Sequence, residues 1–370
     1  MLKVICLFFC VAAVLLLLMV LYTCIKAHFS IKNLKRMDEK GTLYYADYVG
    51  NYYDPLLSLP FRLFRGGGCS AFIARDENGG VITGRNFDLP HKDAEGWVTG
   101  LNVVLNLHPK GGYKSLNIAD AAFISYLKLP YYAGMLDGKV TKTPLILLPY
   151  LSMDGMNEKG LCVSILALDT KTGEAPVLQN DSGKKPVTIN QLLRLILDRC
   201  ADISEAYRLA QGYNLVNIFN YDYHLFLTDS SGLSCVFEWR YNSLTVTYTD
   251  ISTNFYNGYD DACDCYYGES LKERFAAPKD FKKEYHYGYG HGYSRFASLA
   301  ESIDRISFDG GPAVMTTDTA FGLLKSVVQE YDPESLTSFT QYSALYHNSG
   351  LAVDVCPSGD FSKKFHFEMK

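Results

Sequence analysis

The chain begins with a long apolar run that favours a membrane-spanning helix. Residues 4–25 carry no charge over 22 positions and read VICLFFCVAAVLLLLMVLYTCI. As a helix, a run of this length matches the thickness of a bilayer core. A buried core helix would have a polar face, and a cleavable signal sequence would have a shorter apolar stretch with small residues at its cleavage site. We therefore predict a single-pass membrane anchor over residues 1–25.

The charges around this run leave its orientation open. Lys3 precedes the run, whereas Lys26, Lys32, Lys35 and Arg36 follow it. The positive-inside rule alone would place the rest of the chain in the cytoplasm. A signal-anchor would place it on the other side of the membrane, and we expect the body of the chain to be extracytoplasmic.

The composition fits a large folded domain and argues against a nucleic-acid partner. Hydrophobic residues make up 48% of the 370 residues and charged residues 20%, so a sizeable core can form. The formal net charge is −5 with no long basic run, which argues against nucleic-acid binding. The 28 Tyr and 21 Phe suit strands and the walls of apolar pockets. The ten cysteines are mostly scattered singly, unlike those of a disulfide framework. Whether the chain forms a homo-oligomer is not decided by the composition.

Short runs rich in β-branched and aromatic residues dominate the chain after residue 69. Two of them, SAFIARD and GVITGRNFD, are joined through Asn78-Gly79, a strong short-range signal for a hairpin. Thr188 can cap a helix over 189–211, and helices are also predicted near 294–304 and at 318–332. This order of elements predicts a layered α+β domain. The other predicted strands are 101–107, 121–127, 161–168, 223–229, 233–240, 243–249, 341–348, 350–355 and 363–369.

Cys69 begins the first of these runs and follows three glycines at 66–68, which mark a flexible backbone. If the bond between Gly68 and Cys69 is cut, Cys69 carries both a thiol and an α-amine. The amine has a pKa near ~7.7–8.0, so it can act as a base at neutral pH. The hairpin brings Arg85 and Asp88 back beside Cys69. Arg85 would favour the thiolate, and Asp88 would hold the ammonium group. The alternative is a turn cysteine beside a surface ion pair.

The stretch CSAFIARDENGGVITGRNFD resembles the N-terminal motif of the choloylglycine hydrolase and penicillin V acylase family of N-terminal-nucleophile hydrolases. In that family an arginine follows the nucleophilic cysteine by sixteen residues and an aspartate by nineteen, which here are Arg85 and Asp88. The resemblance spans residues 69–370 and implies an αββα sandwich of two antiparallel sheets between helix layers. Further blocks resemble the family in order: DGMNEKGL at 154–161, YHLFLTDSSGLSCVFEW at 223–239, TNF at 253–255, SRF at 294–296 and TQYSALY at 340–346.

The resemblance also implies a role for each site residue. Cys69 would be the nucleophile and proton acceptor, and Arg85 and Asp88 would orient and polarise it. Asn254 would donate to the tetrahedral oxyanion, a contribution worth about 3–4 kcal/mol, and Arg295 would support the site electrostatically. Without the resemblance, Asn254 would be a turn residue and Arg295 a surface residue at a helix start.

The sequence departs from the family at two places. Ala167 stands where bile-salt hydrolases have a second asparagine and penicillin acylases a tyrosine, so a backbone amide replaces that donor or the alignment slips. In addition, 68 residues precede Cys69, whereas bile-salt hydrolases expose their cysteine by losing the initiator methionine. The long leader resembles N-acylethanolamine acid amidases and isopenicillin N acyltransferases, which cut before an internal cysteine. We therefore expect a connector or propeptide at 26–68 and an amidase domain at 69–370.

Two groups of side chains suggest a metal site, but neither has the spacing of a known one. A Cys-x-Cys pair near two histidines differs from the usual structural zinc sites, and three nearby aspartates lack the oxygen spacing of a calcium loop. We therefore expect no metal and no organic cofactor. These candidate ligands are Cys263, Cys265, His286, His291, Asp260, Asp261 and Asp264.

Together, these features predict an enzyme that hydrolyses a linear amide bond through a thioester at Cys69, after autoproteolysis between Gly68 and Cys69. The substrate would be an N-acyl amide such as a conjugated bile salt, penicillin V or an N-acyl lipid. Two alternatives stay open: an acyltransferase of the isopenicillin type, and a catalytically silent binding protein tethered to the membrane.

Overall fold

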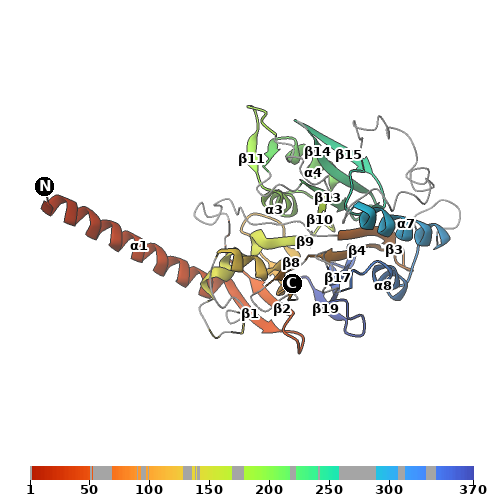
Figure 1. Cartoon of the computed structure of the whole chain (residues 1–370), viewed down its shortest axis with the longest axis horizontal. Coiled ribbons are helices and arrows are strands. Elements are labelled where there is room, and N and C mark those ends of the chain that lie inside the picture. Colours follow the sequence, from red (N-terminus) through yellow and green to blue (C-terminus); the bar gives the residue numbers. More distant parts are fainter. Residues whose placement is uncertain are drawn as a thin grey trace.

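Two large sheets and a projecting N-terminal helix are the main features of the described residues in the computed structural model (Figure 1). The larger sheet, sheet A, has nine strands in the order β1-β2-β7-β8-β9-β10-β13-β14-β15. Its neighbours are antiparallel except β2 and β7, which run parallel. The structure describes residues 2–50, 52, 69–89, 91–92, 97–98, 100–127, 136–137, 139, 142–168, 179–216, 222–240, 242–257, 289–306, 313–330 and 339–370.

The smaller sheet, sheet B, has six strands in the order β16-β3-β4-β17-β18-β19, and all its pairs are antiparallel. The strands of sheet A are β1 (Ile31–Arg36), β2 (Leu43–Tyr48), β7 (Asn102–Leu107), β8 (Ser115–Asp120), β9 (Ser152–Asn157), β10 (Cys162–Leu168), β13 (Asp222–Thr228), β14 (Ser234–Arg240) and β15 (Ser243–Tyr248). Those of sheet B are β3 (Cys69–Arg75), β4 (Val81–Asp88), β16 (Ile251–Ser252), β17 (Thr340–His347), β18 (Ala352–Pro357) and β19 (Phe365–Glu368). Two small sheets pair β5 (His91–Lys92) with β6 (Trp97–Val98) and β11 (Lys185–Val187) with β12 (Tyr213–Leu215).

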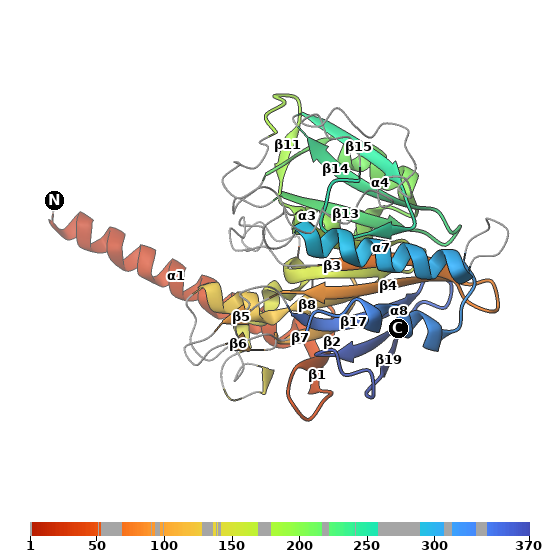
Figure 2. The ribbon, with the colours of Figure 1, turned by 45° about the vertical axis from the view of Figure 1, so that its right-hand side comes forward.

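The two sheets pack against each other, and each carries helices on its other face. One core joins both sheets to α3 (Ile189–Arg199) and α4 (Ile203–Ala210). A second core lies between sheet B and two later helices, α7 (Tyr289–Ile306) and α8 (Thr317–Ser326). Figure 2 shows α7 and α8 against the strands of sheet B. The layers are therefore helices, sheet, sheet and helices, which confirms the predicted αββα sandwich, with the β2–β7 pair as a parallel exception.

The β3–β4 hairpin and the start of α3 form as the sequence predicts. Gly79 has a φ of 82°, a backbone conformation that favours glycine, and it closes the turn between the two strands. Thr188 and Gln191 form a capping box at the start of α3. The predicted helix over 189–211 is divided, because α3 ends at Arg199 and Asp202 caps a new helix, α4.

Two other predictions of secondary structure are wrong. Residues 121–127 form the 3-10 helix η1 (Ala121–Leu127) instead of a strand. The Asp120 carboxylate accepts the N–H of Ala122 at 2.9 Å, which favours a turn at this point over an extended chain. Helix α8 ends at Ser326, short of the predicted residue 332.

Helix α1 (Leu2–Ser30) is longer than the predicted anchor and joins the body directly. Its span Phe9–Ser30 contains an unburied window that is long and apolar enough to cross a membrane, a property that an anchor shares with a signal sequence. Ser30 is followed at once by β1, and its carbonyl oxygen accepts the N–H of Val49. Thr143 Oγ1 donates to Cys24 Sγ at 3.3 Å, which links the helix to the 3-10 helix η2 (Thr143–Leu151).

Strands β1 and β2 come from the segment that we expected to be a connector or propeptide. All of β2 is buried, and it lies between β1 and β7 in sheet A. Tyr52 is also buried, and its hydroxyl donates to Asp198 Oδ1 at 2.6 Å. Its ring lies edge-on to the rings of Tyr48 and Tyr150. Strand β2 and Tyr52 of this segment therefore belong to the core.

Candidate active site

The β3–β4 hairpin places three of the predicted site residues together. Cys69 begins β3 and lies opposite Phe87 of β4, while Arg85 lies opposite Ala71. Residues opposite each other in an antiparallel pair share a face, so Cys69 and Arg85 lie on one face of sheet B. Asp88 is the last residue of β4. The exposed fractions of Cys69, Arg85 and Asp88 are 3%, 0% and 0%, so all three are buried.

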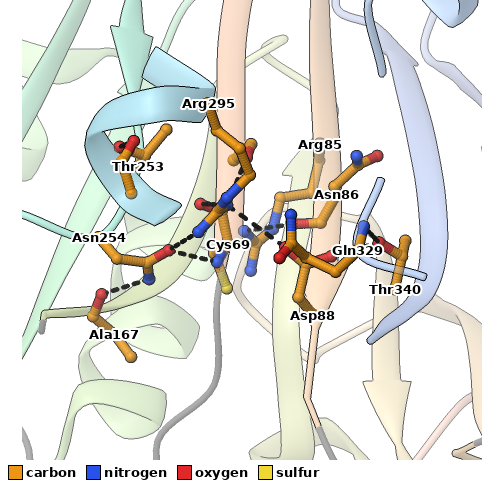
Figure 3. Close-up of polar contacts among 12 residues, drawn as sticks. Cys69, Arg85, Asn86, Asp88, Ala167, Thr253, Asn254, Arg295, Gln329 and Thr340 are labelled. Carbon is orange, nitrogen blue, oxygen red and sulfur yellow. Dashed lines mark hydrogen bonds and ion pairs between the residues drawn. The ribbon is translucent and has the colours of Figure 1, made fainter. Parts of the chain in front are cut away.

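The main chain of Cys69 is held by two side chains from distant parts of the sequence. Its N–H donates to Asn254 Oδ1 at 2.6 Å, and its carbonyl oxygen accepts from Arg295 Nη1 at 2.5 Å. The same Arg295 nitrogen donates to Ser70 Oγ at 2.6 Å. Asn254 follows β16, which pairs with β3, and Arg295 lies in α7. Figure 3 shows Asn254 and Arg295 converging on Cys69, so the fold brings all five predicted site residues together.

The hydrogen bonds of Asn254 fix the direction of its amide group. Oδ1 accepts from two donors, the N–H of Cys69 and Arg295 Nη2, the latter at 2.6 Å, so this atom must be the oxygen. Nδ2 donates one of its two hydrogens to the carbonyl oxygen of Ala167 at 2.6 Å. Ala167 therefore reaches the site through its backbone carbonyl, which accepts a hydrogen bond, whereas a backbone donor was one of the two alternatives that the sequence left open.

Asp88 is held between a cation and a hydroxyl group. Arg295 Nη1 lies 3.4 Å from Asp88 Oδ2, and the Thr340 hydroxyl donates to Asp88 Oδ1 at 2.5 Å. Thr340 Oγ1 also accepts the N–H of Gln329 at 2.9 Å, so the hydroxyl hydrogen is directed at Asp88 (Figure 3). Thr340 belongs to the TQYSALY block, but the sequence alone gave it no role.

Arg85 has a buried acidic partner, Asp154, to which the sequence alone gave no role. Arg85 Nε lies 3.2 Å from Asp154 Oδ2, and Nη2 donates to the carbonyl oxygen of Ile165 at 2.6 Å. Tyr342 and Tyr346 of β17 each donate a hydroxyl to one oxygen of Asp154 at 2.5 Å. Asp154 begins the DGMNEKGL block, which is the only signal in the sequence that could have indicated it.

Burial and nearby charges act on the Cys69 thiol in opposite directions. Burial raises the pKa of the thiol; the Arg85 guanidinium lowers it, the Asp88 carboxylate raises it, and the Asp88 N–H lowers it, with burial dominant. Burial also raises the pKa of Asp88, against the lowering effects of Arg295, Thr340 and Arg85. The thiol of the uncut chain is therefore held mainly in its neutral form, and a nucleophilic role requires a base that can accept its proton.

Metal ligation finds no support within the described residues, where His, Cys, Asp and Glu side chains form no group of three or more that could hold an ion. The side chain of His291, in α7, is not described. The other candidate ligands lie outside the described residues: Cys263, Cys265, His286, Asp260, Asp261 and Asp264.

The four-layer sandwich, with a cysteine at the first residue of a central strand, is the fold of the N-terminal-nucleophile hydrolases. Within this class, the model of the linear amide C-N hydrolases, choloylglycine hydrolase family, matches residues 69–257. The chain belongs to this family, which makes it a linear amide C-N hydrolase by family and supports amide hydrolysis as its reaction class.

Two solved structures that align with TM-scores of 0.50 or more show the same fold. A variant of conjugated bile acid hydrolase from Clostridium perfringens aligns with a TM-score of 0.51 at 16% identity, over 81% of this chain and 92% of that chain. A second mutant of that enzyme aligns with a TM-score of 0.50 at 16% identity, over the same shares of 81% and 92%. Penicillin V acylase from Agrobacterium tumefaciens aligns with a TM-score of 0.49 at 17% identity, over 81% and 86%. No curated protein matches the chain.

Proposed function

We propose that the protein is a cysteine amidase that hydrolyses the C–N bond of an N-acyl amide with Cys69 as nucleophile, after the chain is cut between Gly68 and Cys69. The observation that carries the proposal is the hold on Cys69: Asn254 Oδ1 accepts from its nitrogen while Arg85 lies beside its thiol. A cysteine that served only as a packing residue would need neither contact.

The cut supplies the base that the buried thiol needs. The new α-amine of Cys69 accepts the thiol proton and becomes an ammonium group. The thiolate forms an S–C bond to the substrate carbonyl carbon, and the carbonyl π electrons move to the oxygen. When the tetrahedral intermediate collapses, the C–N bond breaks, the leaving nitrogen takes the proton from the ammonium, and a thioester remains. Water then gives a proton to the amine, attacks the thioester and releases the acid as the C–S bond breaks.

The surrounding residues fit supporting roles in this sequence of steps. Arg85 favours the thiolate electrostatically, and Asp88 together with Arg295 fixes the start of β3. Asn254 Oδ1 receives the α-amine, and the Nδ2 amide group is the donor for the oxyanion. A donor of this kind contributes about 3–4 kcal/mol to transition-state stabilisation.

The substrate class is an N-acyl amide, and three probes cover its range: a glycine-conjugated bile salt, penicillin V and an N-acylethanolamine. The intact mass and N-terminal sequence of the purified protein are measured first, and hydrolysis of each probe is then compared between wild type and Cys69→Ala. We expect a new N-terminus at Cys69, turnover of at least one probe, and an uncut, inactive Cys69→Ala. Cys69→Ser is the matched control, because it keeps a nucleophile of similar size with a much weaker attacking atom.

Four outcomes would contradict the proposal. An active protein with an unbroken chain would remove the α-amine from the mechanism, and activity in Cys69→Ala would remove the thiol. A cut chain that forms a new amide at the expense of acid when an amine is added would favour the acyltransferase. An uncut chain that hydrolyses no probe and takes no label from a thiol-reactive acyl analogue would favour the binding protein.

We further propose that α1 remains attached to the chain as a membrane anchor, with the amidase domain on the extracytoplasmic side. The support is the length and apolar composition of the helix and its direct continuation into sheet A. Fractionation with alkaline carbonate tests the anchor, because an integral protein stays in the membrane pellet. Protease added to intact cells tests the side, because an extracytoplasmic domain is accessible to it.

A further inference from the structure

A buried histidine and a buried glutamate lie behind the turn that carries Asn254. His224 is on β13 and Glu238 is on the neighbouring strand β14, both in sheet A. Their exposed fractions are 0% and 2%. Both belong to the YHLFLTDSSGLSCVFEW block, but no step of the proposed reaction uses either side chain.

The pair holds the backbone on both sides of Asn254. His224 Nε2 lies 2.8 Å from the carbonyl oxygen of Thr253, and His224 Nδ1 lies 3.1 Å from Glu238 Oε1. The same glutamate oxygen accepts the N–H of Asn257 at 2.7 Å. Thr253 directly precedes Asn254 and Asn257 follows it by three positions, so the contacts bracket the residue that holds the Cys69 nitrogen.

This turn is the point where both sheets and a helix meet. The preceding residues, Ile251 and Ser252, pair with β3 in sheet B, whereas His224 and Glu238 belong to sheet A. The Thr253 hydroxyl donates to the carbonyl oxygen of Gly292 in α7 at 2.8 Å. The position of Asn254 relative to Cys69 therefore depends on contacts from sheet A as well as on its own strand.

The partners of His224 restrict its protonation state. A backbone carbonyl can only accept a hydrogen bond, so Nε2 must carry a hydrogen directed at Thr253. Glu238 Oε1 accepts the N–H of Asn257 and also lies within hydrogen-bond distance of Nδ1. If Glu238 is a carboxylate, Nδ1 must donate to it, and a ring with hydrogens on both nitrogens is an imidazolium.

We propose that His224 and Glu238 form a buried imidazolium–carboxylate pair that positions Asn254 against Cys69, and that they affect turnover through Asn254 alone. Neither side chain touches a reacting atom, so both are positioning residues. A buried ion pair is costly to desolvate and often stabilises a fold no more than apolar residues would, so a positioning role accounts for its presence. The kinetic part of this proposal rests on the amidase function proposed above.

The charge state is tested without any substrate. The protein is labelled with ¹⁵N in its eight histidines, and His224→Gln identifies the His224 signals by their loss. We expect both ring nitrogens of His224 to show the signature of protonated nitrogen. A Nδ1 without hydrogen would put the proton on Glu238 and overturn the ion pair.

The positioning role is tested with a double-mutant cycle on a probe amide that the wild type hydrolyses. Loss of a whole oxyanion donor costs about 10²–10³ in kcat, so a displaced Asn254 is expected to cost about 10- to 100-fold in His224→Gln, with KM changed less than about threefold. Because His224 acts through Asn254, His224→Gln should have no further effect on kcat in an Asn254→Ala background. Glu238→Gln, which keeps an acceptor oxygen, should lose less activity than Glu238→Ala.

Thr228→Val is the matched control. Thr228 is buried on the same strand as His224, but its hydroxyl bonds to Thr83 and Asn348, away from Asn254. It should lower stability while leaving kcat within about twofold. Additive effects of His224→Gln and Asn254→Ala, or an equal loss of kcat in Thr228→Val, would refute positioning. If the wild type hydrolyses no amide, the amidase proposal fails. The positioning role of His224 is then tested by the crystal structure of His224→Gln, in which Asn254 must move away from the Cys69 nitrogen.

Discussion

Tyr52→Ala is expected to weaken the binding of the N-terminal segment to the rest of the protein. The effect is measured most directly after the chain has been cut. After cleavage at Gly68, only non-covalent contacts would hold β1, β2 and Tyr52 to the rest of the protein. Tyr52 is completely buried, and its hydroxyl donates to the Asp198 carboxylate. The Arg194 guanidinium lies 5.6 Å from the centre of its ring.

The magnitude follows from these contacts. Removal of a buried aromatic ring costs about 3–5 kcal/mol. Tyr52→Phe keeps the ring and removes only a hydrogen bond to a charged acceptor, which costs about 1.5–3 kcal/mol. Since about 1.4 kcal/mol is tenfold in affinity, the alanine variant should bind its N-terminal fragment about 10²–10⁴-fold more weakly and the phenylalanine variant about 10–100-fold more weakly.

The assay is gel filtration of the cut protein in detergent micelles over a range of urea concentrations. The measured quantity is the fraction of the N-terminal fragment that elutes with residues 69–370. Tyr248→Ala, at a position 67% exposed on β15, is the control and should behave like the wild type. The reasoning is refuted if the wild-type fragment separates as soon as the chain is cut, or if Tyr52→Ala cannot be distinguished from the control.

Three further predictions concern buried or partly buried carboxylates. Thr340→Val removes the hydroxyl group that lowers the pKa of Asp88, and the pKa of Asp88 should therefore rise. The acid limb of the kcat/KM pH profile should then move up by about 1–2 pH units, and an unmoved limb would contradict this. Asp154→Asn leaves the Arg85 charge buried without its carboxylate and should lower the free energy of unfolding in urea by about 3–5 kcal/mol, whereas a loss below about 1 kcal/mol would disprove the ion pair. Burial raises the pKa of Asp354, but hydrogen bonds from two histidines outweigh it and lower the pKa below 3.8. Its stabilising effect is therefore present above pH 3.8 and lost as pH falls through the folded value, so Asp354→Asn should cost about 1 kcal/mol near pH 6 and nothing at the acid end of a thermal-melt series.

The local features of the fold and the predicted site residues could be read from the sequence because short spacings specify them. Asn78-Gly79 specifies the hairpin, and the hairpin brings Arg85 and Asp88 to Cys69 whatever the rest of the chain does. Asn254 and Arg295 lie far away in sequence, and only the family resemblance indicated them. Their contacts with Cys69 depend on how the layers pack, which no local pattern encodes.

The unpredicted features are those decided by distant partners. Asp154 pairs with an arginine 69 positions away, so its charge carries no local sign of that role. Strand β2 pairs in parallel with β7 across a long connection, and its run of tyrosines and charged neighbours resembles a linker. Residues 121–127 are apolar enough for either a buried strand or a buried helix, and a single carboxylate at Asp120 favours the helical turn.

The direct passage from α1 into β1, with no residue between them, sets how the enzyme would meet its substrate in a bilayer. If α1 spans a bilayer, sheet A follows it without a flexible spacer, so the body that carries the site would keep its height and tilt relative to the lipid. Amphiphiles that diffuse laterally in the leaflet would then encounter it in two dimensions, at a local density far above their concentration in water. Such an arrangement suits an amidase whose substrates carry long acyl chains.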